Sequence, residues 1–92
     1  MNKASCQINL RGRLLHMRPA QIISELASRY HSEVRAVHEH VDVDAKSIVE
    51  MIEFAAHMAN SSGKFSFHAH GSDAKEAVSA LEEAVEKNVE ES

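Results

Sequence analysis

The 92-residue sequence is poor in the features that several classes of protein need. It has no tryptophan and only 4% aromatic residues, so it lacks the stacking platforms of single-strand nucleic-acid binders. Its net charge of -4 also argues against nucleic acid as a partner. No apolar run reaches the length of a membrane span or a signal-peptide core. The single cysteine, Cys6, excludes an internal disulfide and favours a reducing cytoplasm.

What the sequence does contain is the composition of one small globular domain, with 43% hydrophobic and 26% charged residues. We expect a single domain over residues 1–92, with a polar tail at 88–92 that frays. Period-2 alternation predicts strands near residues 5–10, 33–36, 40–44 and 64–69. Apolar stripes with helical spacing predict helices near residues 19–30, 48–55 and 74–85. This order predicts an α+β fold, an open-faced two-layer sandwich.

Three local details follow from the same patterns. The connection at residues 38–40 lacks the Asn-Gly or Asp-Gly pair of a tight type I′ turn, so we expect a looser connection. In the first helix, Ser24 and Glu25 fall on the polar side of the stripe. In the first strand, Cys6 falls on the inward side and is expected to be an inert core residue.

The stretch from Leu14 to Ala20 places a histidine and an arginine ahead of a helix. Pro19 lacks a backbone N–H and has a fixed φ, so we expect the helix to begin there, with Arg18 just outside it. His16 then lies beside the unpaired N–H groups of a helix N-terminus, which bind anions. Arg18 adds a guanidinium suited to phosphate oxygens. The stretch fits phosphoryl transfer, although the residues alone favour the simpler interpretation of an ordinary loop histidine beside a surface arginine.

Ser47 and Glu50 have the spacing of a capping box, with Ser47 as the N-cap and Glu50 as the third helical residue. A helix cap is by itself a sufficient explanation of this serine. A phosphate on Ser47 would also be favoured by the helix dipole. The two roles are compatible.

Seven histidines invite a metal hypothesis, because His38 and His40, and likewise His68 and His70, each fall on one side of a strand. If the fourth strand is central and antiparallel, the two pairs lie at opposite ends of the sheet. We therefore expect no metal site, and no cofactor is expected. His57 belongs to neither pair and is expected either to face a partner or simply to be exposed.

Two motifs together identify a family. His16-x-Arg18-Pro19-Ala20 resembles the active-site motif of HPr, the histidine-containing phosphocarrier protein of the bacterial phosphoenolpyruvate-dependent sugar phosphotransferase system. Lys46-Ser47-Ile48-Val49 resembles the regulatory-serine motif of the same family. Each motif opens a helix, the two are about thirty residues apart, and the resemblance covers nearly the whole chain. It implies an antiparallel sheet of order 1-4-2-3 covered on one face by three helices.

The resemblance also implies roles for these residues. His16 would accept a phosphoryl group from phosphorylated Enzyme I on its Nδ1 nitrogen and pass it to an enzyme IIA domain. Arg18 would bind the phosphoryl oxygens, with Met17 and Pro19 completing the cradle at the helix start. Ser47 would be the target of an HPr kinase/phosphorylase. The chain would be a cytoplasmic monomer that carries phosphate without turnover of its own. A regulatory HPr-like docking protein, of the nitrogen-branch or catabolite-control type, is the alternative.

Partner docking in this family uses an apolar patch beside the histidine. The candidate exposed residues here are Met17, Ile48, Met51 and Phe54. Leu14 stands where the family usually has glycine, and Met17 where it usually has a small residue. These two differences bear on the choice of partner more than on the chemistry.

Overall fold

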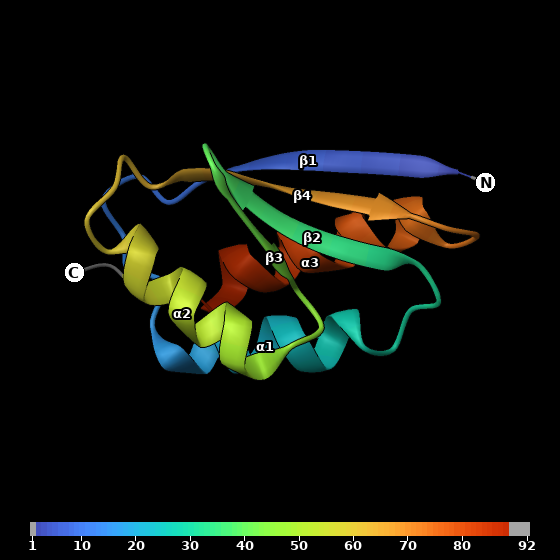
Figure 1. The fold of residues 1–92 in the computed structure, drawn as a ribbon, viewed down its shortest axis with the longest axis horizontal. Coiled ribbons are helices and arrows are strands. Elements are labelled where there is room, and N and C mark those ends of the chain that lie inside the picture. Colours follow the sequence, from blue (N-terminus) through green and yellow to red (C-terminus); the bar gives the residue numbers. More distant parts are fainter. Residues whose placement is uncertain (1, 89–92) are drawn as a thin grey trace.

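The computed structural model describes residues 2–88, and its elements follow the predicted order. They are β1 (Lys3–Asn9), α1 (Met17–Ala27), β2 (Glu33–His38), β3 (Val41–Asp44), α2 (Ile48–Met58), β4 (Lys64–His70) and α3 (Ala74–Asn88). The strands form one antiparallel sheet in the order β1-β4-β2-β3. The helices lie on one face of it, as Figure 1 shows, so the open-faced sandwich of order 1-4-2-3 is confirmed.

Two predictions concern the C-terminal tail and the length of the helices. The expected tail at 88–92 falls outside the described residues except for Asn88, which is the last residue of α3. Its side-chain amide donates a 2.8 Å hydrogen bond to the Ala84 carbonyl. No helix within residues 2–88 is long and apolar enough to cross a membrane.

The core lies between the sheet and the helices and depends on strand alternation. Inward side chains of β2 and β4 are buried, whereas their neighbours along each strand face the open side of the sheet. Phe65 packs edge-on against Phe54 of α2 and against Phe67, with ring centroids 5.3 Å apart in both pairs. Cys6 is half-buried, with its Sγ 3.8 Å from the Val78 carbonyl oxygen. Burial raises the pKa of this thiol, which fits the inert residue predicted.

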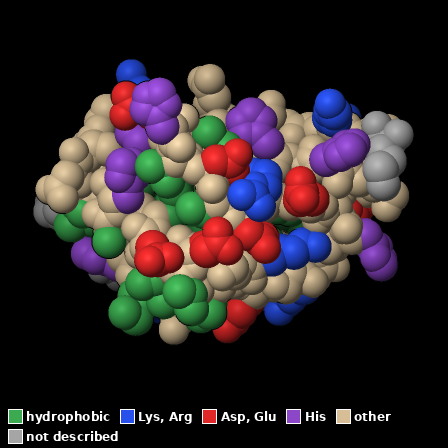
Figure 2. Space-filling model, in the orientation of Figure 1, with side chains coloured by type: hydrophobic (Ala, Val, Ile, Leu, Met, Phe, Trp, Pro, Cys, Tyr) green, Lys and Arg blue, Asp and Glu red, His purple; other side chains and the backbone are tan. Residues whose placement is uncertain are grey.

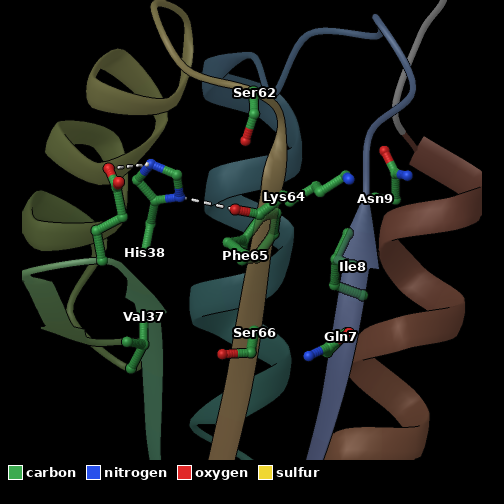
Figure 3. A pocket seen from close by; sticks show the side chains of 10 residues that line it. Gln7, Ile8, Asn9, Val37, His38, Ser62, Lys64, Phe65 and Ser66 are labelled. Carbon is green, nitrogen blue, oxygen red and sulfur yellow. Dashed lines mark hydrogen bonds and ion pairs between the residues drawn. The ribbon is translucent and has the colours of Figure 1, made fainter.

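The β2–β3 connection is tighter than predicted. Only Glu39 and His40 lie between the strands, since His38 pairs with Val41, so the expectation of a looser connection is wrong. Glu39 supplies the left-handed conformation, with φ of 53°, that glycine usually supplies. Its carboxylate Oε1 lies 3.2 Å from Nε2 of the buried His38. The other ring nitrogen, Nδ1, donates to the Lys64 carbonyl at 2.7 Å, and together these contacts hold the turn (Figure 3).

Ser24 joins α1 to the turn that precedes α2. The prediction that it lies on the polar side is wrong, because the side chain is buried and its hydroxyl donates to the Lys46 carbonyl at 2.8 Å. The Lys46 ammonium in turn donates to the Tyr30 carbonyl at 2.8 Å, beyond the end of α1. A buried hydroxyl is tolerated here because it has a hydrogen-bond partner. These bonds fix the position of α2 beside α1.

Candidate functional site

The predicted start of α1 is wrong by two residues. The helix begins at Met17 with His16 as its N-cap, so Arg18 lies inside the first turn and not outside it. The first helical hydrogen bond runs from the Ala20 N–H to the His16 carbonyl at 3.2 Å. Pro19 is therefore the third helical residue. Proline is tolerated there because the N–H groups of the first turn have no intrahelical acceptor in any case.

His16 and Arg18 both remain available to a ligand. Each is exposed, and neither side chain forms a hydrogen bond or ion pair within residues 2–88. The first turn contains no acidic residue that would compete for its N–H groups. The N–H groups of Met17 and Arg18 can thus meet an anion together with the guanidinium of Arg18. The structure places an imidazole, a guanidinium and free backbone donors at one helix start.

The loop that leads to His16 is fixed at both ends. Arg13 donates from Nε to the Leu10 carbonyl at 2.7 Å, and Leu10 in turn donates its N–H to the Gly63 carbonyl at 2.8 Å. Leu15 is buried in the core immediately before the histidine. The Arg13 side chain thus stabilises the loop in which it lies. The buried Leu15 side chain anchors the backbone next to His16.

An apolar hollow of about 260 Å³ lies beside His16, between the start of α1 and the outer side of α2. It is lined by Leu14, His16 and Met17 on one side and by Ile52, Ala56 and Ala59 on the other. Leu14, which replaces the family's usual glycine, therefore contributes its side chain to this hollow. The histidine stands at the edge of an apolar depression large enough to receive a side chain of a partner protein.

The exposure expected of the predicted docking residues holds for two of the four. Met17 and Ile48 are exposed, at 59% and 40%, but Met51 and Phe54 are only 0% and 1% exposed and belong to the core. Sequence reasoning missed Val49, which is 64% exposed. Because α2 is apolar on both faces, its periodicity alone could not tell which face is buried. We define the apolar patch as the exposed or half-exposed residues Met17, Ile48, Val49, Ile52 and Ala56. Figure 2 shows hydrophobic side chains gathered over the starts of α1 and α2.

Ser47 is the N-cap of α2, as predicted. Its Oγ accepts a hydrogen bond from the Glu50 N–H at 3.2 Å. The return bond of a capping box is displaced, since the Glu50 carboxylate accepts from the Asp44 N–H at 3.2 Å and the Ser47 N–H donates to the Asp44 carbonyl at 3.0 Å. Ser47 therefore has a structural role at the start of α2, immediately before Ile48 of the apolar patch.

The histidine pairs are far from each other, as predicted. His70 pairs with Glu33 at the beginning of β2, whereas His38 is the last residue of β2. The structure brings His38 close to a different histidine, the exposed His57 of α2, with ring centroids 5.2 Å apart. Within residues 2–88 no group of three or more His, Cys, Asp or Glu side chains is placed to hold a metal ion.

A larger hollow lies on the uncovered face of the sheet. Its volume is about 650 Å³, and its lining includes Gln7, Asn9, Lys64 and Ser66, as Figure 3 shows. Its lining does not include His16 or Arg18, which lie at the start of α1. We therefore place the candidate site at His16 and not in this hollow.

Comparisons with known proteins identify the family of the chain. A family model described as "PTS HPr component phosphorylation site" matches residues 5–87. The phosphocarrier protein HPr of Treponema pallidum (strain Nichols) is 32% identical over 77 residues, which are 84% of each chain.

Solved structures agree as well. The phosphocarrier protein HPr of Bacillus anthracis has a TM-score of 0.75 at 25% identity, covering 91% of this chain and 98% of that one. The Bacillus subtilis catabolite repression protein Crh, a domain-swapped dimer, has a TM-score of 0.66 at 27% identity, covering 91% and 94%. The resemblance that the two motifs indicated is confirmed. The chain belongs to the HPr family of the phosphotransferase system.

Proposed function

We propose that this chain carries a phosphoryl group on His16, which it receives from phosphorylated Enzyme I and delivers to an enzyme IIA domain. The observation that carries the proposal is the start of α1. There an exposed imidazole, which has no hydrogen-bond or ion-pair partner among residues 2–88, stands at the start of the helix two residues before Arg18, next to backbone N–H groups of the first turn. These residues also match the family's active-site motif, His16-x-Arg18-Pro19.

The chemistry at this site is nucleophilic. The lone pair of an unprotonated His16 nitrogen, Nδ1 in this family, forms a bond to phosphorus while the bond from phosphorus to the donor breaks. The donor keeps the electron pair of that bond. Negative charge on the phosphoryl oxygens is stabilised by the N–H groups of Met17 and Arg18 and by the guanidinium. Transfer to the enzyme IIA domain is the same displacement with His16 as the leaving group.

Ser47 is proposed as a second, regulatory site. A phosphate there would lie at the N-terminus of α2, where the helix dipole favours it, and next to the exposed Ile48 of the apolar patch. It would change the surface that a partner meets without touching His16. The cytoplasmic location and the monomeric state stay predictions.

The test is phosphorylation by a purified Enzyme I with phosphoenolpyruvate, followed by mass spectrometry. We expect an acid-labile phosphoryl adduct on the unsubstituted chain that is absent from His16→Ala. His68→Ala, which removes another exposed histidine, is the matched control and should retain the adduct. No adduct, or an adduct that persists in His16→Ala, would contradict the proposal.

A second arm adds enzyme IIA domains to the phosphorylated chain. Loss of the adduct to an enzyme IIA domain supports the carrier role. An adduct that no enzyme IIA domain removes would instead favour the regulatory alternative, in which phosphorylation of His16 is a signal. The similarity to Crh is consistent with that alternative, but its TM-score of 0.66 is below the 0.75 of the phosphocarrier, so we prefer the carrier.

A further inference from the structure

The outer face of α2 has an apolar side and an acidic side. Val49 and Glu53 are both exposed and stand four residues apart, so they are neighbours on the helix surface. The helix contains Glu50 and Glu53 but no lysine or arginine. Ile48 and Ile52 lie on the other side of Val49, and Ile52 borders the hollow beside His16. Figure 2 shows acidic side chains beside the hydrophobic ones on this part of the surface. The apolar patch therefore has an acidic edge.

The two glutamates at this edge differ in what they already bind. The carboxylate of the half-buried Glu50 accepts the Asp44 N–H at 3.2 Å and so helps to fix the turn before α2. Glu53 is exposed, and within residues 2–88 its side chain forms no hydrogen bond or ion pair. Asp42 on the neighbouring strand is paired with Arg35 at 2.9 Å. Glu53 is thus an uncompensated carboxylate immediately beside exposed apolar surface.

The opposite border of the patch has the other sign of charge. Arg18 is exposed one residue after Met17, and within residues 2–88 its side chain has no ion pair. A partner that covers the patch between Arg18 and Glu53 therefore meets a cation at the phosphoryl site and an anion at the far edge of α2. Charges at the border of an interface chiefly set orientation and the rate of encounter.

We propose that Glu53 is a specificity-determining residue of the docking surface, recognised by a lysine or arginine on the Enzyme I that phosphorylates this chain. This inference rests on the proposed function. Apolar contacts with Val49 and Ile52 supply the area of the interface, while the ion pair at Glu53 fixes how the partner lies on α2. A partner with a carboxylate at that point is rejected, because two like charges would face each other.

The test measures the rate of phosphoryl transfer from Enzyme I, kept phosphorylated with phosphoenolpyruvate, at increasing concentrations of this chain. Glu53→Lys should raise KM roughly five- to tenfold, the effect of replacing an exposed attraction by a repulsion. The kcat should not change, because Glu53 takes no part in the chemistry at His16. The difference in KM between the two chains should shrink as KCl is raised, since salt screens exposed charges.

Glu33→Lys is the matched control. It makes the same charge change at the exposed first residue of β2, which pairs with His70 of β4 and belongs neither to α2 nor to the apolar patch, and it should leave KM unchanged. Circular dichroism and thermal melting verify that Glu53→Lys is folded, as expected for an exposed side chain that has no partner among residues 2–88. An unchanged KM, or equal effects of Glu53→Lys and Glu33→Lys, would overturn the inference while the carrier function stands. No transfer to the unsubstituted chain would overturn the function and the inference together.

Discussion

The Asp73 carboxylate accepts two hydrogen bonds from Ser32, one from its backbone N–H at 2.9 Å and one from its hydroxyl at 2.6 Å. The other carboxylate oxygen accepts the His31 N–H at 2.9 Å. Asp73 immediately precedes α3, so this side chain fastens the loop between α1 and β2 to the start of the last helix. The Ser32 hydroxyl, followed by the His31 N–H, lowers the pKa of Asp73 to about 2.

This pKa predicts an acid-dependent loss of stability. A carboxyl group whose pKa is lower in the folded state stabilises the fold above its unfolded-state pKa. The contribution of Asp73 should therefore be complete above pH 3.8 and disappear as the pH falls to about 2. Asp73→Asn should lower the free energy of unfolding at pH 7 and reduce its dependence on pH in that window, as measured by urea unfolding. Parallel pH profiles of the two chains would contradict the assignment.

Gly71 should be the least replaceable glycine. It has φ of 152°, and a Cβ there would lie 2.7 Å from Cα of Ser32, which is backbone and cannot move aside. Gly71→Ala should therefore lower the free energy of unfolding by roughly 2–3 kcal/mol. Gly12→Ala, at φ of 83° with nothing within 4 Å of the added Cβ, should cost only about 1 kcal/mol. Equal losses in the two variants, measured by urea unfolding, would show that the contact with Ser32 is relieved.

The cap of α2 predicts a smaller effect at Ser47. Ser47→Ala removes the acceptor of the Glu50 N–H and should lower the free energy of unfolding by about 1 kcal/mol. Ser62→Ala changes an exposed serine outside the helices and should stay within about 0.5 kcal/mol of the unsubstituted chain. If both variants behave alike in urea unfolding, the cap contributes little.

The proposed docking surface predicts two separate effects of substitutions in α2, one on stability and one on transfer. Phe54→Ala creates a cavity in the core and should lower the free energy of unfolding by about 3–5 kcal/mol. Val49→Ala should change stability by less than about 0.5 kcal/mol, because the side chain is 64% exposed. It should instead raise KM for transfer from Enzyme I, since apolar contact area is lost. If Val49→Ala instead lowered the free energy of unfolding and left KM unchanged, Val49 would belong to the core and not to the apolar patch.

Arg18 should act on transfer and not on folding. Arg18→Ala removes the charge proposed to bind the phosphoryl oxygens and should slow phosphorylation of His16 by roughly tenfold or more. Its thermal unfolding should be unchanged, because the side chain is exposed and without partners within residues 2–88. Arg29→Ala, an exposed arginine beyond the other end of α1, is the control. An undiminished rate in Arg18→Ala would remove Arg18 from the site.

Local patterns in the sequence predicted the elements and their order, because strand and helix periodicities are set by neighbouring residues. The start of α1 was misplaced because proline tolerates every first-turn position and not only the first one. The burial of Met51 and Phe54 was missed because α2 is apolar on two faces, and only the contact with Phe65 of β4 reveals which one is covered.

Contacts between residues that are far apart in the sequence could not be predicted from local sequence patterns. Asp73 and Ser32 are 41 residues apart, and neither belongs to a pattern that would suggest a partner. The burial of the Ser24 hydroxyl could not be predicted either, because its acceptor, the Lys46 carbonyl, lies 22 residues away in the sequence. The positions of His16 and Ser47 beside helix starts could be predicted because each residue belongs to a short local motif.

The position of β4 in the sheet has a consequence for the order in which the chain can fold. β4 pairs with both β1 and β2, although it is the last strand to be synthesised. A nascent chain that ends before Lys64 therefore offers β1 no strand to pair with, and the loop before His16 lacks its bond to Gly63. Such pairing between distant segments slows folding. The candidate site at His16, although encoded in the first quarter of the chain, becomes fixed only once the chain extends through Gly63 and β4.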